Sequence, residues 1–370
     1  MLVKQKLLNR ALALARGIAP SGRPLNPLWT YLYLEGREKE LVIRTANEEM
    51  DLEVRLPAMG EEGGPVLVPA SPFIRAVENA PGDEDEEDKE VIILIQEGQV
   101  EVRAWPWRAT INAAGPEGFP AWPESDTALR TRMDAQDLLR ALSQVRYAVS
   151  RESWRAIFRG VQLEFSDRGF RAVASDGYRL ALFDLERPQP FTKKAVVPAR
   201  SVDELMRVLR GAEGEVDLAV GTSTMTMAAW QEKGVVRIAV RLMPGEFPDY
   251  ERVIPKEFPL TVTLEAEPFR EALKRVSILA NKENHRVDLS LEGKRALLFA
   301  EGDYGKGQEE IPVSLEGAPM SLAYDARHFL DAVSRVEGEV VMRFSGQFTP
   351  TLIEPADGSG YLAVVVPLKV

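Results

Sequence analysis

VPARSVDELMRVLRGAEGEVDLAV, residues 197–220, contains the unit from which the chain is built. A short extended lead-in enters a helix, a glycine closes the helix, and a strand follows. The apolar residues of the helix recur at i, i+3, i+4 and i+7, which is the spacing of an amphipathic helix with one buried face. These residues are Val202, Leu205, Met206 and Leu209.

This helix occurs twice more in the chain. The earlier copy repeats the Val-Pro-Ala lead-in from Val68, and the later copy has Tyr324-Asp325-Ala326 in its place. The matching apolar residues are Phe73, Ala76, Val77 and Ala80 in the earlier copy and Phe329, Ala332, Val333 and Val336 in the later one. A second helix repeats at the same interval, through Leu8, Ala11, Leu12 and Ala15, then Leu138, Ala141, Leu142 and Val145, then Phe269, Ala272, Leu273 and Val276. Two ordered markers at an interval of about 130 residues, the size of a domain, predict three copies of one domain.

Two proline-rich segments mark the boundaries between these copies. Residues 115–125 contain GFPAWP and residues 244–259 contain EFPDYERVIP. Proline removes backbone donors and favours extended chain, so both segments are predicted to be stiff connectors. The predicted domains are residues 1–125, 126–250 and 251–370, each an α+β unit of two helices and roughly eight short antiparallel strands. In the first domain we expect a helix over 4–19 and strands over 29–34, 41–45 and 52–56.

The edges of these sheets lead to a prediction about assembly. Exposed strand edges promote unwanted pairing, and a row of similar domains removes most of them by pairing edge to edge. A head-to-tail dimer with two-fold symmetry would remove the two outermost edges and close a ring. Within the middle domain, Asp176-Gly177 predicts a hairpin turn. Pro367 places the apolar terminal stretch 361–370 at a sheet edge or a strand end.

Composition restricts the function classes. The chain of 370 residues has no cysteine, two histidines and a net charge of −11. It therefore has no disulfide or thiolate metal site, and few candidates for imidazole catalysis. Its first residues do not resemble a signal peptide, and its longest apolar run, 361–368, is too short to span a bilayer. We expect a cytoplasmic protein that needs no membrane.

Catalytic and cofactor motifs are missing from the sequence. There is no Walker A loop, GxGxxG, HExxH or GxSxG motif. GDYGKG at 302–307 has the glycines of a phosphate loop but not its Lys-Ser/Thr or the following helix. The acidic run 83–90, DEDEEDKE, lacks fixed ligand spacing and is interpreted as a solvated turn. We predict no catalytic residue, no metal and no cofactor, with a metal-dependent hydrolase using the acidic clusters as an alternative.

Basic residues concentrate on the predicted helices. They include Lys4, Lys6, Arg10, Arg16, Arg75, Arg140, Arg146, Arg207, Arg210, Lys274, Arg275 and Arg335. If the helices share one side, this acidic protein gains a mildly basic face. The alternative for any single arginine is an ordinary solvated helix surface.

Several stretches together resemble the bacterial DNA polymerase III beta subunit, the family of replication sliding clamps. They are ASDGYRLAL (174–182), FPDYERVIP (247–255), VPARSVDELMRVL (197–209), RVSILANKENHRVDLSL (275–291) and YLAVVVPLKV (361–370). The resemblance covers the whole chain. It implies three clamp domains per chain and a homodimeric ring around duplex DNA, without sequence preference.

The resemblance also implies a groove between the second and third domains that binds short peptides of partner proteins. Its residues would be Phe158, Ser175, Gly177, Tyr178, Arg179, Leu180, Pro248, Arg252, Val253, Val364, Val366, Pro367 and Leu368. The expected partners are the polymerase alpha subunit, the clamp loader and other proteins carrying a clamp-binding motif. The family often has histidine where this chain has Tyr178, and methionine at Val366 and Leu368. Without the resemblance, these apolar residues read as core or edge packing.

Two further sets of residues follow from the resemblance. The DNA-facing set is Arg10, Arg23, Arg75, Arg140, Arg146, Arg200, Arg207, Arg210 and Lys274. The dimer interface would bring Ile278 and Leu279 against the strand that contains Trp107 and Ile111 of a second copy. The alternative function is a peptide-binding scaffold that is independent of DNA.

Overall fold

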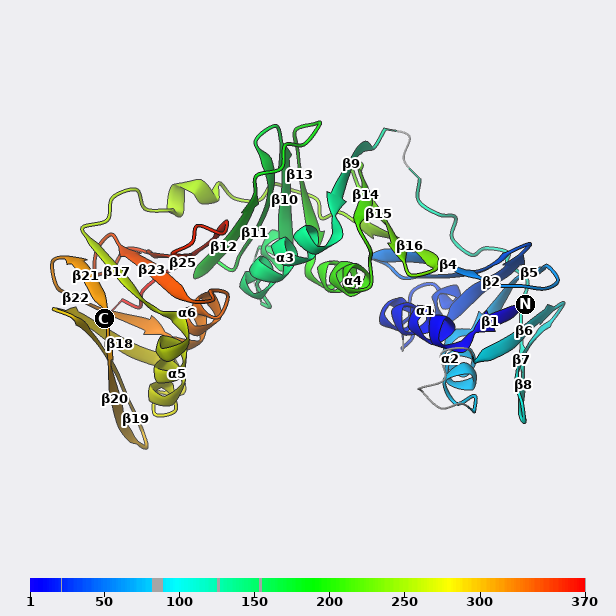
Figure 1. The fold of residues 1–370 in the computed structure, drawn as a ribbon, viewed down its shortest axis with the longest axis horizontal. Helices are drawn as coiled ribbons and strands as arrows, with labels where there is room; N and C mark the ends of the chain where they lie inside the picture. The colour runs from blue at the N-terminus through cyan, green and yellow to red at the C-terminus, as the bar shows by residue number, and fades with distance from the viewer. Residues whose placement is uncertain (21, 82–88, 125–126, 153–154, 370) are drawn as a thin grey trace. The chain divides into compact units, whose positions relative to one another are not determined.

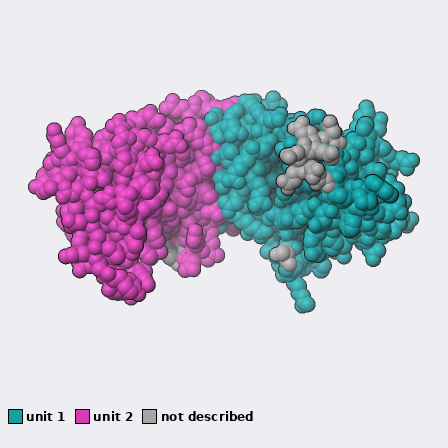
Figure 2. Space-filling model, turned by 60° about the horizontal axis from the view of Figure 1, so that its bottom comes forward, with its two compact units in different colours: residues 1–139, 200–243 teal, residues 140–199, 244–370 magenta. Residues whose placement is uncertain are grey.

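The computed structural model describes residues 1–20, 22–81, 89–124, 127–152 and 155–369. Its contacts divide the chain into two compact units, coloured in Figure 2. Unit 1 comprises residues 1–139 and 200–243, and unit 2 comprises residues 140–199 and 244–370. Most of the predicted acidic run, 83–88, lies outside the described residues.

The helices follow the predicted repeat. They are α1 (Gln5–Ile18), α2 (Ala70–Glu78), α3 (Ala135–Val145), α4 (Ala199–Arg210), α5 (Ala266–Ser277) and α6 (Ala326–Val333). Every predicted apolar position of α1, α3, α4 and α5 is buried. In α2, Ala76 is only half-buried and Ile74 is buried beside it, whereas Val336 is buried just beyond the end of α6. The predicted one-sided helices are therefore confirmed, with small shifts at their ends.

Unit 1 contains two antiparallel sheets. The eight-stranded sheet has the order β5-β2-β3-β4-β16-β15-β14-β9, and the four-stranded sheet has the order β1-β6-β7-β8. The strands of the larger sheet are β2 (Tyr31–Arg37), β3 (Glu40–Ala46), β4 (Met50–Pro57), β5 (Gly63–Pro69), β9 (Leu129–Asp134), β14 (Glu215–Val220), β15 (Thr224–Gln231) and β16 (Gly234–Arg241). Those of the smaller sheet are β1 (Leu2–Lys4), β6 (Glu90–Gln96), β7 (Gln99–Ala104) and β8 (Trp107–Asn112). Helix α1 packs on β3 and β4 and against α2 (Figure 1).

Unit 2 repeats this plan. Its nine-stranded sheet has the order β13-β10-β11-β12-β25-β24-β23-β17-β21, and its four-stranded sheet has the order β20-β19-β18-β22. The strands of the larger sheet are β10 (Gly160–Ser166), β11 (Gly169–Ser175), β12 (Arg179–Leu185), β13 (Lys193–Pro198), β17 (Leu260–Glu265), β21 (Ser314–Gly317), β23 (Glu339–Phe344), β24 (Thr351–Pro355) and β25 (Tyr361–Val365). Those of the smaller sheet are β18 (Arg286–Glu292), β19 (Arg295–Gly302), β20 (Gly305–Pro312) and β22 (Met320–Asp325). Helices α5 and α6 pack through Phe269 and Phe329, whose rings meet edge to face with their centroids 5.4 Å apart.

Each large sheet is a joint between two predicted repeats. In unit 1, β4 pairs with β16, with Val54 opposite Val236. In unit 2, β12 pairs with β25, with Ala181 opposite Ala363. Strands from neighbouring repeats thus share their edge hydrogen bonds, as predicted for a row of domains. The domain boundaries at 125 and 250 stay a prediction.

One local expectation is corrected, and another, a sheet edge or a strand end at Pro367, is confirmed in its strand-end option. The strand expected from Trp29 begins at Tyr31, because residues 27–30 form a short 3-10 turn. Asn26 caps that turn by accepting a hydrogen bond from the Leu28 N–H at 3.0 Å. The terminal strand β25 lies in the interior of its sheet and not at an edge, and it ends at Val365, so Pro367 follows the strand.

Candidate functional site

The β11–β12 hairpin provides the first part of the candidate site, which lies in unit 2. The Oδ1 atom of Asp176 accepts hydrogen bonds from the N–H groups of Tyr178, at 2.9 Å, and Arg179, at 3.0 Å. Gly177 has a φ of 92°, a conformation that glycine adopts without strain. The turn leaves the Tyr178 side chain 66% exposed. The predicted hairpin at Asp176-Gly177 is confirmed, and its tip presents an aromatic ring.

The C-terminal segment runs along this hairpin. After β25 ends, the Val366 N–H donates to the Tyr178 carbonyl at 3.0 Å, and the Leu368 N–H donates to the Ala323 carbonyl of β22 at 2.7 Å. Pro367, between them, has no N–H to satisfy and is buried. The segment is therefore held at two points, with the Val366 side chain turned outward and 37% exposed.

The connector 244–259 packs onto the same part of the sheet. Its residues Phe247, Tyr250 and Ile254 join an apolar cluster with residues of β11, β12 and β25, namely Val173, Leu180, Leu182, Leu362 and Val364. The Phe247 ring also meets the Phe158 ring edge to face, with 5.7 Å between centroids. The connector is thus fixed by apolar burial, which explains how a proline-rich segment holds one position.

The Tyr250 hydroxyl group of this connector lies between two charged side chains of the large sheet. It donates to Glu164 at 3.0 Å and accepts from Arg171 at 3.1 Å. Arg171 in turn forms a two-point ion pair with Asp184. Burial raises the pKa of Tyr250, so the phenol stays protonated through the physiological range.

The structure divides the predicted groove residues into two groups. Ser175, Leu180, Val364 and Pro367 are buried, as the core-packing interpretation expected. The residues with exposed or partly exposed side chains are Phe158, Tyr178, Pro248, Arg252, Val253, Val366 and Leu368, with Gly177 exposed at the turn. Arg252 pairs with Asp249 at 2.7 Å. The second group is therefore the accessible part of the predicted groove, and the first group lies buried beneath it.

Arg179 has a different role from a ligand contact. It donates to Asp176, to Asp331 of α6, and to the Tyr147 carbonyl at 3.2 Å. Burial opposes its charge, but the hydrogen bond to Asp331 and the two carboxylates raise its pKa. The side chain therefore links the hairpin to α6.

Residues that sequence reasoning missed complete this link. The hydroxyls of Tyr147 and Tyr361 lie 2.6 Å apart, and the Tyr361 hydroxyl donates to the Ala332 carbonyl at 2.9 Å. His328 stacks on Tyr178 with 6.0 Å between ring centroids, and burial lowers the pKa of His328. These partners lie far apart in the chain, so no local pattern indicated them.

The predicted DNA-facing residues of unit 1 are exposed but partly paired. Arg10 forms an ion pair with Glu232 at 2.6 Å, and Arg207 lies 3.5 Å from Glu204. Arg200 donates to the Gly17 carbonyl at 3.4 Å, which ties α4 to the end of α1. Arg23, Arg75 and Arg210 are also exposed. The Arg10–Glu232 pair is exposed on both sides and therefore weak, whereas Glu204 is buried beside Arg207.

The predicted DNA-facing residues of unit 2 differ from one another in exposure and in their partners. Arg140 lies over the Phe183 ring, 5.3 Å from its centroid, and Lys274 pairs with Glu271 at 2.7 Å. Arg146 is only half-buried and has a partner. The helix surfaces of unit 2 therefore carry basic groups that are partly neutralised or covered.

The two small sheets end in open edges. In the described part of unit 1, β8 pairs only with β7; in that of unit 2, β20 pairs only with β19. Trp107 at the start of β8 is 39% exposed, and Ile278 after α5 is 78% exposed. Ile111 and Leu279 are half-buried. Exposed apolar groups beside an unpaired edge are typical of a surface that associates.

Among the described residues, no group of three or more His, Cys, Asp or Glu side chains is arranged to hold a metal ion. Within that same part of the chain, no helix has the length and apolar character needed to cross a membrane.

Family models cover nearly the whole chain in three consecutive matches. They are the DNA polymerase III beta subunit N-terminal domain at residues 1–121, its central domain at 132–249 and its C-terminal domain at 251–369.

The chain belongs to the DNA polymerase III beta subunit family.

Curated relatives in this family are named beta sliding clamps. That of Caulobacter vibrioides is 26% identical over 352 residues, covering 93% of each chain. That of Pseudomonas putida is 26% identical over 375 residues, covering 99% of each. As a beta subunit, the chain is a DNA replication sliding clamp and a non-catalytic subunit of DNA polymerase III. The hydrolase and the DNA-independent scaffold are set aside by this membership.

Solved structures of the family share the fold. The Pseudomonas aeruginosa sliding clamp bound to griselimycin aligns with a TM-score of 0.92 at 24% identity, covering 100% of this chain and 99% of that one. The Thermotoga maritima beta subunit aligns with a TM-score of 0.89 at 23% identity, covering 100% and 99%. The predicted α+β fold of clamp domains is therefore confirmed.

Proposed function

We propose that two copies of this beta subunit close head to tail into a ring around duplex DNA and tether the polymerase to it. The observation that carries the proposal is strand pairing across the predicted domain boundaries, β4 with β16 and β12 with β25. The same pairing between copies would satisfy β8 of one chain with β20 of the other. Each chain would supply three domains, divided near residues 125 and 250.

The proposed contact between copies uses the apolar residues beside these edges. Ile278 and Leu279, after α5, would pack against Trp107 and Ile111 of the second copy. Ile278 is 78% exposed in the single chain, so its burial would contribute free energy to association. Arg108 on β8 and Glu310 on β20 have opposite charges, which favours this pairing of unlike edges.

The proposed basic set would bind DNA and still allow it to slide through the ring. Lysine and arginine contacts to phosphate vary little in energy along a duplex, because the phosphate backbone is nearly uniform. The set is Arg10, Arg23, Arg75, Arg140, Arg146, Arg200, Arg207, Arg210 and Lys274. Weak pairs such as Arg10 with Glu232 allow these side chains to move between protein and phosphate anions.

Partner proteins would bind at the hairpin, connector and terminal segment of unit 2. Tyr178, Val253 and Val366 present exposed apolar surface there, above a buried aliphatic floor. Apolar anchors of a short peptide would bury this surface. We propose the polymerase alpha subunit, the clamp loader and other motif-bearing proteins as partners, in the bacterial cytoplasm where the chromosome is replicated.

The ring is tested by topology. The protein is loaded onto a nicked circular plasmid with a clamp loader and ATP, separated from free protein by gel filtration, and then treated with a restriction enzyme. We expect it to remain on the closed circle and to leave once the DNA is linear. Equal retention on linear and circular DNA would contradict the ring.

Matched variants separate the ring from general DNA affinity. Ile278→Ala with Leu279→Ala should give a monomer by light scattering and lose retention on the circle. Phe348→Ala, which removes an equally apolar side chain that is 53% exposed elsewhere, should leave both unchanged. A dimer that survives the double substitution would remove the interface assignment.

Deleting residues 366–370 should abolish binding of an apolar motif peptide and leave the dimer intact.

A further inference from the structure

The two large sheets have the same plan but different outer edges. Aligned by strand order, β9 of the eight-stranded sheet corresponds to β17 of the nine-stranded sheet. The outer edge of β17 is occupied by β21, with Thr261 opposite Glu316 and Thr263 opposite Ser314. In the described part of the chain, β9 pairs only with β14. The fold thus has a place for one more strand, filled in one unit and open in the other.

The sequence explains why the chain does not fill this place itself. The segment that corresponds to β21 by the repeat interval is RPQPFT, residues 187–192. Pro188 and Pro190 have no N–H groups and cannot donate to a neighbouring strand. The N–H of Gln189, between them, donates to the Ser166 carbonyl at 2.8 Å. The segment is therefore held elsewhere by its own contacts.

The open edge carries two arginines on one face. Arg130 and Arg132 are two residues apart on β9, so their side chains lie on the same face of the sheet. Arg132 pairs with Asp217 at 2.8 Å, and the two side chains are 71% and 43% exposed, so this surface pair is weak. Arg130 forms no ion pair with any residue that the structure describes. An added strand on β9 would place its alternate side chains beside these two arginines.

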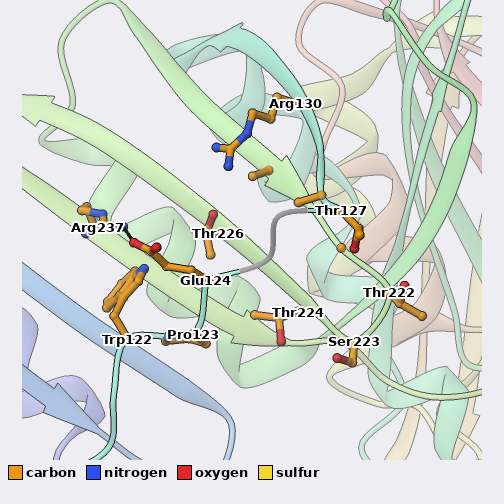
Figure 3. Close-up of a pocket in the computed structure, with 13 residues that line it drawn as sticks. Trp122, Pro123, Glu124, Thr127, Arg130, Thr222, Ser223, Thr224, Thr226 and Arg237 are labelled. Carbon is orange, nitrogen blue, oxygen red and sulfur yellow. Dashed lines mark ion pairs between the residues drawn. The ribbon is translucent and has the colours of Figure 1, made fainter.

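A hollow on this face continues inward from the edge. It has a volume of about 450 Å³ and reaches from Arg130 to Arg237 across Thr226 (Figure 3). A second hollow of about 450 Å³ adjoins it and shares these three residues. The floor consists of small side chains, including Ala219 and Ala228. The Arg237 guanidinium at the inner end is already engaged, since it lies over Trp122 and 3.6 Å from the Glu124 carboxylate. Side chains of an added segment that turn onto this face would therefore meet space and hydroxyl groups, with Arg130 at the outer end.

We propose that the edge of β9 binds an extended acidic segment of a partner protein as a ninth strand. The preferred segment has a carboxylate at every second residue, because Arg130 and Arg132 are spaced in that way. The β17–β21 pair supplies the template: Glu316 lies opposite Thr261, the residue that corresponds to Arg130. Main-chain hydrogen bonds would supply affinity, and the two arginines would set register and charge preference.

The test uses a fluorescent synthetic peptide of alternating glutamate and threonine, with fluorescence anisotropy at low salt. This peptide has no apolar anchor, so the groove of unit 2 does not compete for it. We expect Arg130→Glu with Arg132→Glu to weaken binding at least about tenfold, since two attractions become repulsions. The matched control, Lys233→Glu with Lys294→Glu, changes the net charge equally at exposed turns and should bind like the unchanged protein.

Two versions of the peptide distinguish strand addition from simple charge attraction. Methylating every second amide nitrogen removes the donors on one side of the strand, and methylating the alternate set removes those on the other. One version should lose binding and the other should keep it, because only one side of an added strand faces β9. Equal affinities for the two versions, no detectable binding of the unmethylated peptide, or binding that survives the double arginine substitution would each overturn the proposal. Binding should also persist after deletion of residues 366–370, which separates it from peptide binding at the unit 2 site.

Discussion

The two proline-rich connectors share a Phe-Pro pair but pack against different kinds of side chain. Each carries Phe-Pro, at Phe119 in unit 1 and Phe247 in unit 2, and each lays its aromatic ring on a large sheet. In unit 1, Phe119 meets Tyr33 at 5.7 Å, and the Arg44 guanidinium lies 5.4 Å from both rings. In unit 2, Phe247 joins an aliphatic and aromatic cluster.

The next aromatic residue of each connector shows the same contrast. Trp122 stacks under Arg237, 4.5 Å from its guanidinium carbon, at the margin of a polar hollow. Tyr250, at the matching position, is 5% exposed and packs among apolar residues. One scaffold thus presents a charged surface at one joint and an apolar surface at the other. The repeat determines where the connector lies, and its individual side chains determine what the joint can bind.

The largest expected difference between the joints concerns these two aromatics. Tyr250→Ala should lower the free energy of unfolding of unit 2 by about 3–5 kcal/mol, because it leaves a cavity and removes the shared partner of Glu164 and Arg171. Trp122→Ala should cost unit 1 only about 1–2 kcal/mol, since that ring is partly exposed. Hydrogen exchange of β11 and β12, compared with β15 and β16, measures the two effects. Equal losses would mean that the joints are energetically alike.

The next effect concerns the link between the hairpin and α6. Arg179→Ala should destabilise unit 2 by about 2 kcal/mol, because it leaves Asp176 without its buried partner while Asp331 stays half in water. Asp331→Asn keeps an acceptor for the same guanidinium and should cost about half as much. Exchange rates at β12 and β25 report the opening of this joint. Identical rates in the Arg179→Ala variant and the parent would show that apolar packing alone holds it.

Alkaline titration compares the units without mutation. Burial raises the pKa values of Tyr147, Tyr250, Tyr324 and Tyr361, all in unit 2. Among the described residues of unit 1, burial raises the pKa of one tyrosine, Tyr33. A raised folded pKa leaves stability intact below the ordinary tyrosine value of about 10, and stability falls as the pH rises above it. Tyrosinate absorbance should therefore appear in two stages. The second stage should coincide with the unfolding of unit 2, which is followed by limited proteolysis. A single stage that precedes any unfolding would contradict the burial argument.

The sequence predicted the repeat because helix periodicity and connector spacing are local signals. It predicted the hairpin at Asp176-Gly177 for the same reason, since turn chemistry lies within four residues. It did not predict the partners of Arg179, because Tyr147 and Asp331 lie far away in the chain and carry no local pattern. It also placed the terminal strand at an edge as one option, whereas β25 lies between β12 and β24. Arg44 and Arg171, which reach the two connectors, are separated by the repeat interval, and that spacing was a usable signal.

The smallest expected effect tests whether the arginine at the first connector acts through its shape. Arg44 is 14% exposed, lies over Tyr33 and Phe119, and donates to the Pro120 carbonyl at 2.8 Å. Arg44→Lys keeps the charge but loses the planar group that stacks on two rings while donating, so we expect a cost of about 0.5–1 kcal/mol. The corresponding Arg171→Lys should cost more, because it breaks a two-point pair with Asp184 as well as the bond to Tyr250. Exchange rates at β3 and β11 compare the two variants directly. If Arg44→Lys proves the more damaging, stacking on the aromatics outweighs hydrogen bonding, and the first connector is the more tightly held of the two.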